Sequence, residues 1–215
     1  MKRNWNPIPF NRSSSIDDVA PSSTSSTSSS PSGSRRRPRA DAERNRTRVL
    51  DAAREVFRAR GDEAQMPEVA RAAGVGIGTV YRHFPSRAAL IAAVGEQRQA
   101  EIVEFGRSRC LPSARATDGL AAYLEHIGEV LDAERGLSAS IEAAFGSTEP
   151  TGEGRARAED IASQLLARAK EEGTVREDAE VGDVVMIVCG LAAVIRYDAG
   201  DWRRYVRNAC AGLRS

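Results

Sequence analysis

Apolar side chains recur at helical spacing along most of this chain, and the pattern begins after Ala40. A first helix carries apolar residues three or four positions apart and is expected to stop at Gly61. A short second helix has Pro67 in its first turn, where proline is tolerated, and ends at Gly74. Pro85 halts a third helix. Three short helices in close succession are therefore predicted.

The rest of the chain keeps the same period. An apolar stripe runs from about 114 to 134, and a further helix is closed at Gly173. From 181 to 195 nearly every residue is apolar, which predicts a helix buried on all sides. Asp201 is a suitable N-cap for the last helix. With no strand alternation and no repeat, we expect an all-α fold of about nine helices.

The first 39 residues have a different composition. Ser and Thr dominate from 11 to 34, and such a segment buries too little apolar surface to offset its ordering entropy, so we predict disorder over 1–39. The segment ends in the basic cluster 35–39, which either follows DNA phosphates or a minor groove, or is a solvated tail.

Formal charge is distributed unevenly. Residues 1–40 carry seven basic and two acidic groups, a net charge of +5, whereas residues 99–215 carry fourteen basic and twenty acidic groups, a net charge of −6. The middle, 41–98, is at +2 with ten basic and eight acidic groups. A basic amino-terminal side on a nearly neutral chain suggests a phosphate-bearing partner.

Several classes of protein are not indicated. No apolar stretch approaches the roughly 20 residues of a membrane span, and no apolar region of a signal peptide follows the basic start. The three cysteines are too scattered for a disulfide framework or a zinc site. With only His83 and His126, no convergent catalytic set is evident. We expect a cytoplasmic protein that is not an enzyme and holds no metal or cofactor.

Two helices joined by a tight turn at Gly74 describe a helix-turn-helix. Ala70 and Ala73 are small where the two helices would cross closely, and Val80 can fill the crossing. The second of these helices would then present outward a mixture of glycines, hydroxyls, an aliphatic side chain and a cation: Gly76, Ile77, Gly78, Thr79, Tyr81, Arg82 and His83. Such groups suit a major groove, although a helical hairpin with no role on DNA has the same spacing.

The residues from 69 to 87, with the core Gly-Thr-Val-Tyr-Arg-His-Phe-Pro at 78–85, strongly resemble the tetracycline-repressor (TetR) family of bacterial regulators. The resemblance covers about 43–95. It implies a homodimer whose third helices enter successive major grooves of a palindromic DNA operator. It also implies a carboxy-terminal domain that binds a small molecule and thereby changes the separation of the two helix-turn-helix units.

The resemblance assigns DNA contacts by position. Arg46 and Thr47 match phosphate contacts, the seven residues between 76 and 83 match the recognition helix, and Arg87 matches a backbone contact. The chain departs from the family pattern at the head of the second helix. A capping Thr or Ser is usual there, but the order is Ala-Gln-Met-Pro from Ala64, which predicts a weaker cap and one lost contact. The resemblance further implies domains at 40–86 and 87–215.

Candidates for the ligand and dimer sites come from the apolar carboxy-terminal half. Ligand candidates are aromatic and polar residues on inward faces: Phe105, Tyr123, His126, Phe145, Met186 and Trp202. Tyr123 and His126 would share a helix face, although each candidate could equally be an ordinary core residue. The two last helices are too apolar for one small subunit, so their packing against a second copy is expected to bury Val184, Val188, Leu191, Ile195, Tyr205 and Ala209.

Three functions remain open at this point. The first is a ligand-responsive repressor, the second a constitutive DNA-binding dimer without a ligand, and the third a small helical enzyme. A cavity of some hundreds of Å³ in the carboxy-terminal bundle would distinguish the first from the second.

Overall fold

This computed structural model describes residues 36–147 and 152–215. Of the predicted disordered segment 1–39, residues 1–35 lie outside the described residues, and residues 36–39 are helical, contrary to the prediction. The described residues form nine α-helices and no strand, which confirms the predicted all-α fold. The helices are α1 (Arg36–Arg60), α2 (Met66–Ala73), α3 (Ile77–His83), α4 (Arg87–Phe105), α5 (Ala116–Ala133), α6 (Arg135–Phe145), α7 (Gly152–Glu171), α8 (Val181–Arg196) and α9 (Trp202–Gly212). None of these helices is long and apolar enough to span a membrane.

Helix α1 begins at Arg36, earlier than the expected start after Ala40. Pro38 is tolerated in its first turn because the first N–H groups of a helix have no partner within it. A 3-10 turn over Gly61–Glu63 follows α1. The head of α2 is capped, because the backbone N–H of Gln65 donates to Glu68 Oε2 over 3.0 Å. The Glu68 carboxylate thus supplies the acidic half of a capping box at the head of α2.

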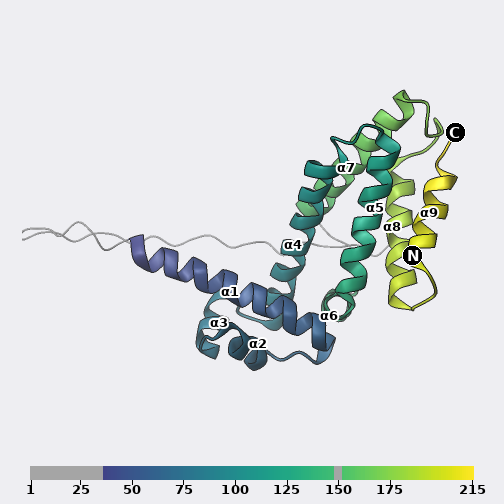
Figure 1. Cartoon of the computed structure of the whole chain (residues 1–215). Helices are drawn as coiled ribbons and strands as arrows, with labels where there is room; N and C mark the ends of the chain where they lie inside the picture. The colour runs from purple at the N-terminus through teal and green to yellow at the C-terminus, as the bar shows by residue number, and fades with distance from the viewer. Residues whose placement is uncertain (1–35, 148–151) are drawn as a thin grey trace, which may run out of the picture. The chain divides into compact units, whose positions relative to one another are not determined.

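Helices α1, α2 and α3 gather at the amino-terminal end of α4 (Figure 1). The turn between α2 and α3 depends on Gly74, whose φ of 63° is costly for residues with a Cβ. Arg48 of α1 closes the same turn by donating from Nη2 to the Ala73 carbonyl over 2.6 Å. Val80 and Phe84 then pack into the amino-terminal core. The predicted helix-turn-helix is therefore held to α1 by both packing and hydrogen bonding.

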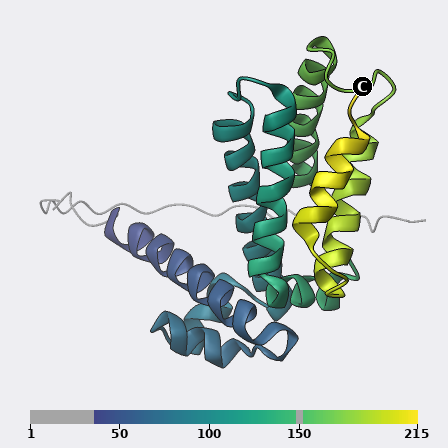
Figure 2. The ribbon, with the colours of Figure 1, turned by 45° about the vertical axis from the view of Figure 1, so that its right-hand side comes forward.

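The second core lies between α5, α7, α8, α9 and the distal part of α4. Figure 2 shows α9 lying along α8 and α5. The interpretation of α8 as a helix buried on all sides is wrong for a single subunit, because Met186 is 65% exposed. Only one side of α8 faces the rest of its own chain, through Val184, Leu191 and Ile195.

The two cores divide within α4 and not at its start. Leu90, Ile91 and Val94 pack with the helix-turn-helix, whereas Ile102 packs in the bundle. Helix α6 also joins the amino-terminal core, through Leu137 among others. The predicted boundary between residues 86 and 87 stays a prediction, but no break between the cores occurs there.

Replacing Gly136 by alanine should destabilise the fold. The added methyl carbon would lie 2.5 Å from the carbonyl oxygens of both Phe57 and Arg58, so α6 would have to move away from α1. Such overpacking costs about 1–3 kcal/mol. Gly182→Ala is the matched control, because no atom lies within 4 Å of a Cβ at that position. Urea unfolding measures both variants, and identical midpoints would contradict the tight contact.

Candidate nucleic-acid interface and ligand cavity

Helix α3 has one buried and one exposed side. Val80 is fully buried and Phe84 is 3% exposed, so both pack α3 against the amino-terminal core. Ile77 and Tyr81 are 41% and 49% exposed, and Arg82 is also exposed. Large apolar and aromatic side chains at this exposure leave a surface that is suited to a partner.

The two glycines of α3 are not required by the fold. Gly76 has an ordinary φ of −69°, and no atom lies within 4 Å of a Cβ built on Gly76 or Gly78. Alanine or serine would therefore fit at both positions. The absence of side chains lowers the surface at the amino-terminal turn of α3, which lets another molecule approach the backbone closely.

The remaining predicted contacts surround α3 to different degrees. Thr79 and His83 are half-buried. The Arg46 guanidinium lies 5.4 Å from the centroid of the Phe84 ring, which holds this cation beside the end of α3. Thr47 is exposed, and its hydroxyl donates to the Glu43 carbonyl over 3.2 Å. All of these residues belong to one region of α1 and α3.

Arg87 has a structural role that the sequence did not indicate. Its Nε donates to the Ala64 carbonyl over 3.1 Å and its Nη2 to the Asp62 carbonyl over 2.8 Å. The guanidinium also lies 5.4 Å from the centroid of the Phe57 ring. Arg87 thus ties α4 to the segment between α1 and α2, and its contact with phosphate stays a prediction.

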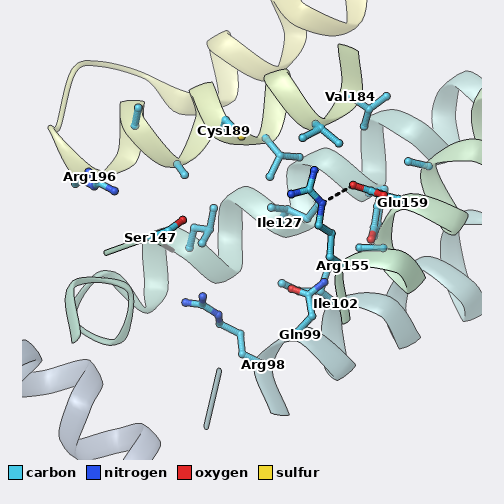
Figure 3. A pocket seen from close by; sticks show the side chains of 18 of the residues that line it. Arg98, Gln99, Ile102, Ile127, Ser147, Arg155, Glu159, Val184, Cys189 and Arg196 are labelled. Atoms are coloured by element: carbon cyan, nitrogen blue, oxygen red, sulfur yellow. Dashed lines mark hydrogen bonds and ion pairs between the residues drawn. The ribbon is translucent and has the colours of Figure 1, made fainter. Parts of the chain in front are cut away.

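The carboxy-terminal bundle contains a cavity of about 340 Å³. It lies between α4, α5, α7 and α8 and is lined mainly by aliphatic side chains, among them Ile102, Ile127, Val184 and Val188 (Figure 3). Of the six predicted ligand residues, only Tyr123 lines it. The cavity volume lies within the range typical of small-molecule sites.

The other five candidates have different environments. Phe105 and His126 stack on each other, with ring centroids 3.7 Å apart, and burial lowers the pKa of His126. Trp202 packs against Gly128 and donates from Nε1 to Asp132 Oδ2 over 3.2 Å. Phe145 and Met186 are 52% and 65% exposed. The prediction that these five line a ligand site is not supported, because none of them borders this cavity.

A three-residue step explains why Tyr123 and His126 separate. Such a step leaves two side chains about 60° apart around a helix. On α5 this angle turns Tyr123 into the cavity and His126 against Phe105. Sharing a helix face was therefore too coarse a criterion for a shared site.

Charged residues in the cavity wall were missed by the sequence analysis. Arg98 is only 5% exposed, because it lies on the buried side of α4 in line with Ile91 and Val94. The sequence did carry a signal for this residue, because an arginine at a helical position between apolar residues is unusual and points to a buried charge. Arg155 pairs with Glu159 over 2.7 Å and Arg196 with Glu142 over 2.8 Å, all at the same cavity (Figure 3).

A buried ionic cluster lies next to Arg98. Arg54 of α1 donates from Nε to Glu134 Oε1 over 2.5 Å and from Nη1 to Glu101 Oε1 over 2.7 Å. Glu134 is 6% exposed and begins α6. This cluster joins α1, α4 and the α5–α6 junction by charge-assisted hydrogen bonds, close to the cavity wall.

The predicted dimer residues fall into two groups. Val184, Leu191 and Ile195 are 0–3% exposed within one subunit, so they have no area left to bury against a second copy. This corrects the prediction, which did not distinguish the two sides of α8. Val188 lines the cavity and Tyr205 donates to the Ile187 carbonyl over 3.2 Å. Ala209 is half-buried on α9, and its contact with a second copy stays a prediction.

Two family models match the chain. Residues 49–94 match the model described as bacterial regulatory proteins, tetR family, and residues 115–215 match the SbtR-like transcriptional regulator, C-terminal domain. Among curated proteins, the HTH-type transcriptional regulator SrpR of Pseudomonas putida is 46% identical over 61 residues. That match covers 28% of this chain and 29% of SrpR, so this chain matches less than a third of the length of that relative.

Solved structures match over a greater length. A TetR transcription regulatory protein from Mycobacterium vanbaalenii is 35% identical, with a TM-score of 0.61 over 83% of this chain and 99% of that one. FadR from Bacillus subtilis, solved in complex with stearoyl-CoA, is 18% identical, with a TM-score of 0.59 over 79% and 97% of the two chains. The second similarity concerns the fold.

Replacing Gly78 by alanine should affect stability and DNA binding in opposite directions. Alanine in a helix stabilises the folded chain by roughly 0.5–1 kcal/mol, and the position has room for the methyl group. The same methyl group should hinder close approach of α3 to a groove and so weaken DNA binding. Thermal melting and fluorescence anisotropy measure the two effects. Gly182→Ala should leave DNA affinity unchanged, and an unchanged affinity in G78A would reject the close approach.

Proposed function

This chain belongs to the TetR family of DNA-binding transcriptional regulators, and from that premise we propose that it is a ligand-responsive repressor. Two copies bind a palindromic operator, and a small molecule that enters the bundle cavity releases them. The observation that carries the DNA-binding part is the exposed side of α3, where two glycines have free space around them and Tyr81 and Arg82 face outward.

The residues of α3 match the chemistry of a major groove. Arg82 can donate to phosphates or to guanine, the Tyr81 hydroxyl can bond to phosphate, and Ile77 can contact a thymine methyl group. Arg46 and Thr47 lie beside the same surface and supply phosphate contacts. A single α3 reads one half-site, so a palindrome requires a second copy about 34–36 Å away.

The exposed side of α8 supplies the dimer surface. Met186 is 65% exposed and Tyr197 is 70% exposed, while Ile187 and Val194 are half-buried. An apolar surface on the last long helix is typical of an interface between helical subunits. The side of α8 that faces the subunit's own core is not part of this surface.

The cavity supports control by a small molecule. Helix α4 carries Ile102 in the cavity wall and Leu90 in the core of the helix-turn-helix, so a ligand that shifts α4 also moves α3. FadR, which shares the fold, has been solved with stearoyl-CoA, so this architecture can hold a small molecule. A cavity of this size favours a ligand-responsive regulator over a constitutive DNA-binding dimer.

Replacing Arg82 by alanine should weaken operator binding by about 1–3 kcal/mol. If Arg82 contacts phosphate, the slope of log affinity against log salt should also fall by about one, because one counterion fewer is released. The probe is duplex DNA selected by the native protein from a random pool. Arg207→Ala, an exposed arginine on α9, is the control and should bind normally. Unchanged affinity in R82A would remove Arg82 from the interface.

Replacing Met186 by glutamate should weaken the dimer by more than about tenfold, since it places a charge on the exposed apolar side of α8. Sedimentation equilibrium measures the association constant. Ala139→Glu adds the same charge at an exposed position of α6 and should leave association unchanged. A dimer that tolerates M186E would place the interface elsewhere.

A further inference from the structure

Arg98 is the most deeply buried of the charged groups that line the cavity. Its residue is 5% exposed, whereas the side chains of Glu142, Arg155, Glu159 and Arg196 are 36–48% exposed. Figure 3 shows Arg98 extending from α4 at the opposite end of the cavity from Val184 and Glu159. The cavity therefore has a buried positive charge at one end.

The other charges of the cavity are already balanced. Arg155 is paired with Glu159, and Arg196 is paired with Glu142. Arg98, by contrast, donates from Nη1 to the neutral hydroxyl of Ser138 over 2.9 Å. Within the part of the chain that the structure describes, no carboxylate lies within ion-pair distance of it.

Glu134 acts on Arg98 through space and forms no direct ion pair with it. Glu134 interacts with Arg98 electrostatically, but its Oε1 already accepts a hydrogen bond from Arg54. Arg54 is also paired with Glu101, so the two arginines have two carboxylates near them, of which only Glu134 is buried. Burial lowers the pKa of Arg98, although a guanidinium stays charged in proteins. Arg98 therefore keeps its charge in the cavity wall, within the described residues, without a carboxylate in direct contact with it.

The fold does not require this charge. Arg98 continues the apolar row of Ile91, Val94 and Ile102, where a methionine or leucine would pack without desolvating an ion. A buried charge that lacks a partner is costly, and its replacement by an apolar residue is often neutral or stabilising. The position of Arg98 is better explained by an anion that the chain binds.

Tyr123 supplies a second polar group without a partner. It is 2% exposed, and its hydroxyl has no hydrogen-bond partner in the described chain. The Tyr123 ring packs against Gly106, where an added Cβ would lie 2.9 Å from the ring. Gly106 is eight residues beyond Arg98, so Tyr123 lies about 12 Å further along the helical axis. Ile102 and Ile127 line the space in between.

We propose that the cavity takes an organic acid with an apolar body. Its carboxylate accepts hydrogen bonds from the forked guanidinium of Arg98, and its body covers Ile102 and Ile127. Tyr123 is left to bond with a polar group at the far end of a longer ligand. This inference names the class of the effector, and its role in regulation rests on the function proposed above.

The first experiment varies only the head group. Decanoate, 1-decanol and decylamine share one apolar body, and 4-phenylbutyrate with its alcohol and amine forms a second set. Isothermal titration calorimetry with the native full-length chain should give saturable binding of at least one acid, at least about tenfold tighter than its alcohol, with the amine weakest. Equal binding of acid and alcohol, tighter binding of the amine, or no binding of either acid would overturn the proposal.

The second experiment removes the charge. Arg98→Met keeps an unbranched apolar stem without the guanidinium and should weaken binding of the acid by roughly 10–100-fold while leaving the alcohol unaffected. Arg98→Lys should bind the acid with intermediate affinity. Arg207→Met makes the same change at an exposed arginine of α9 that does not line the cavity, and it should retain the acid's affinity. Undiminished acid binding by R98M would overturn the assignment, and the head-group series decides the matter if R98M does not fold.

A parallel measurement separates this inference from the proposed function. The same compounds are added to the native protein bound to its selected DNA. If the acid binds through Arg98 but does not alter DNA affinity, the organic-acid site stands and the ligand-responsive repressor is rejected. If the alcohol or amine releases DNA and neither acid binds, the repressor stands and the organic-acid site is rejected.

Discussion

The burial of a single helix, α4, in two cores is the constraint on which the rest of the structure depends. Its 19 residues extend about 28 Å, with Leu90 and Ile91 packed under the helix-turn-helix and Ile102 packed in the bundle. Because hydrogen bonds make a helix stiff along its axis, neither end can shift without displacing the other. One helix therefore forms part of the cavity wall and part of the core beneath α3.

A second connection reinforces this one through α6. Leu137 fills the amino-terminal core, and Gly136 allows the backbone of α6 to approach the end of α1. The buried pair of Arg54 and Glu134 lies at the same junction. Charged groups removed from water tolerate little change in geometry, since a broken pair leaves an uncompensated charge. The ion pair and the close approach at Gly136 thus fix α6 against the end of α1.

Local signals predicted the helix-turn-helix well. Gly74 marked the turn, and Val80 and Phe84 marked the buried side of α3, because period and glycine placement report directly on neighbouring residues. The same reasoning identified only Tyr123 in the cavity and could not distinguish the two sides of α8. Those features depend on which helices meet, which is a matter of long-range packing. Arg98 was missed because a charged residue in an apolar row can be assigned to a cavity only when the neighbouring helices are known.

The sequence by itself determined the helical class, the position of the helix-turn-helix and the outward residues of α3, since each follows from spacing along a few turns of one helix. Only the tertiary structure decided that Arg87 is tied to the chain's own carbonyls, that Leu191 belongs to the subunit's core and that Arg98 faces a cavity. The physical reason is that hydrogen-bond partners, burial and uncompensated charge arise between helices distant in sequence, where periodicity carries no information.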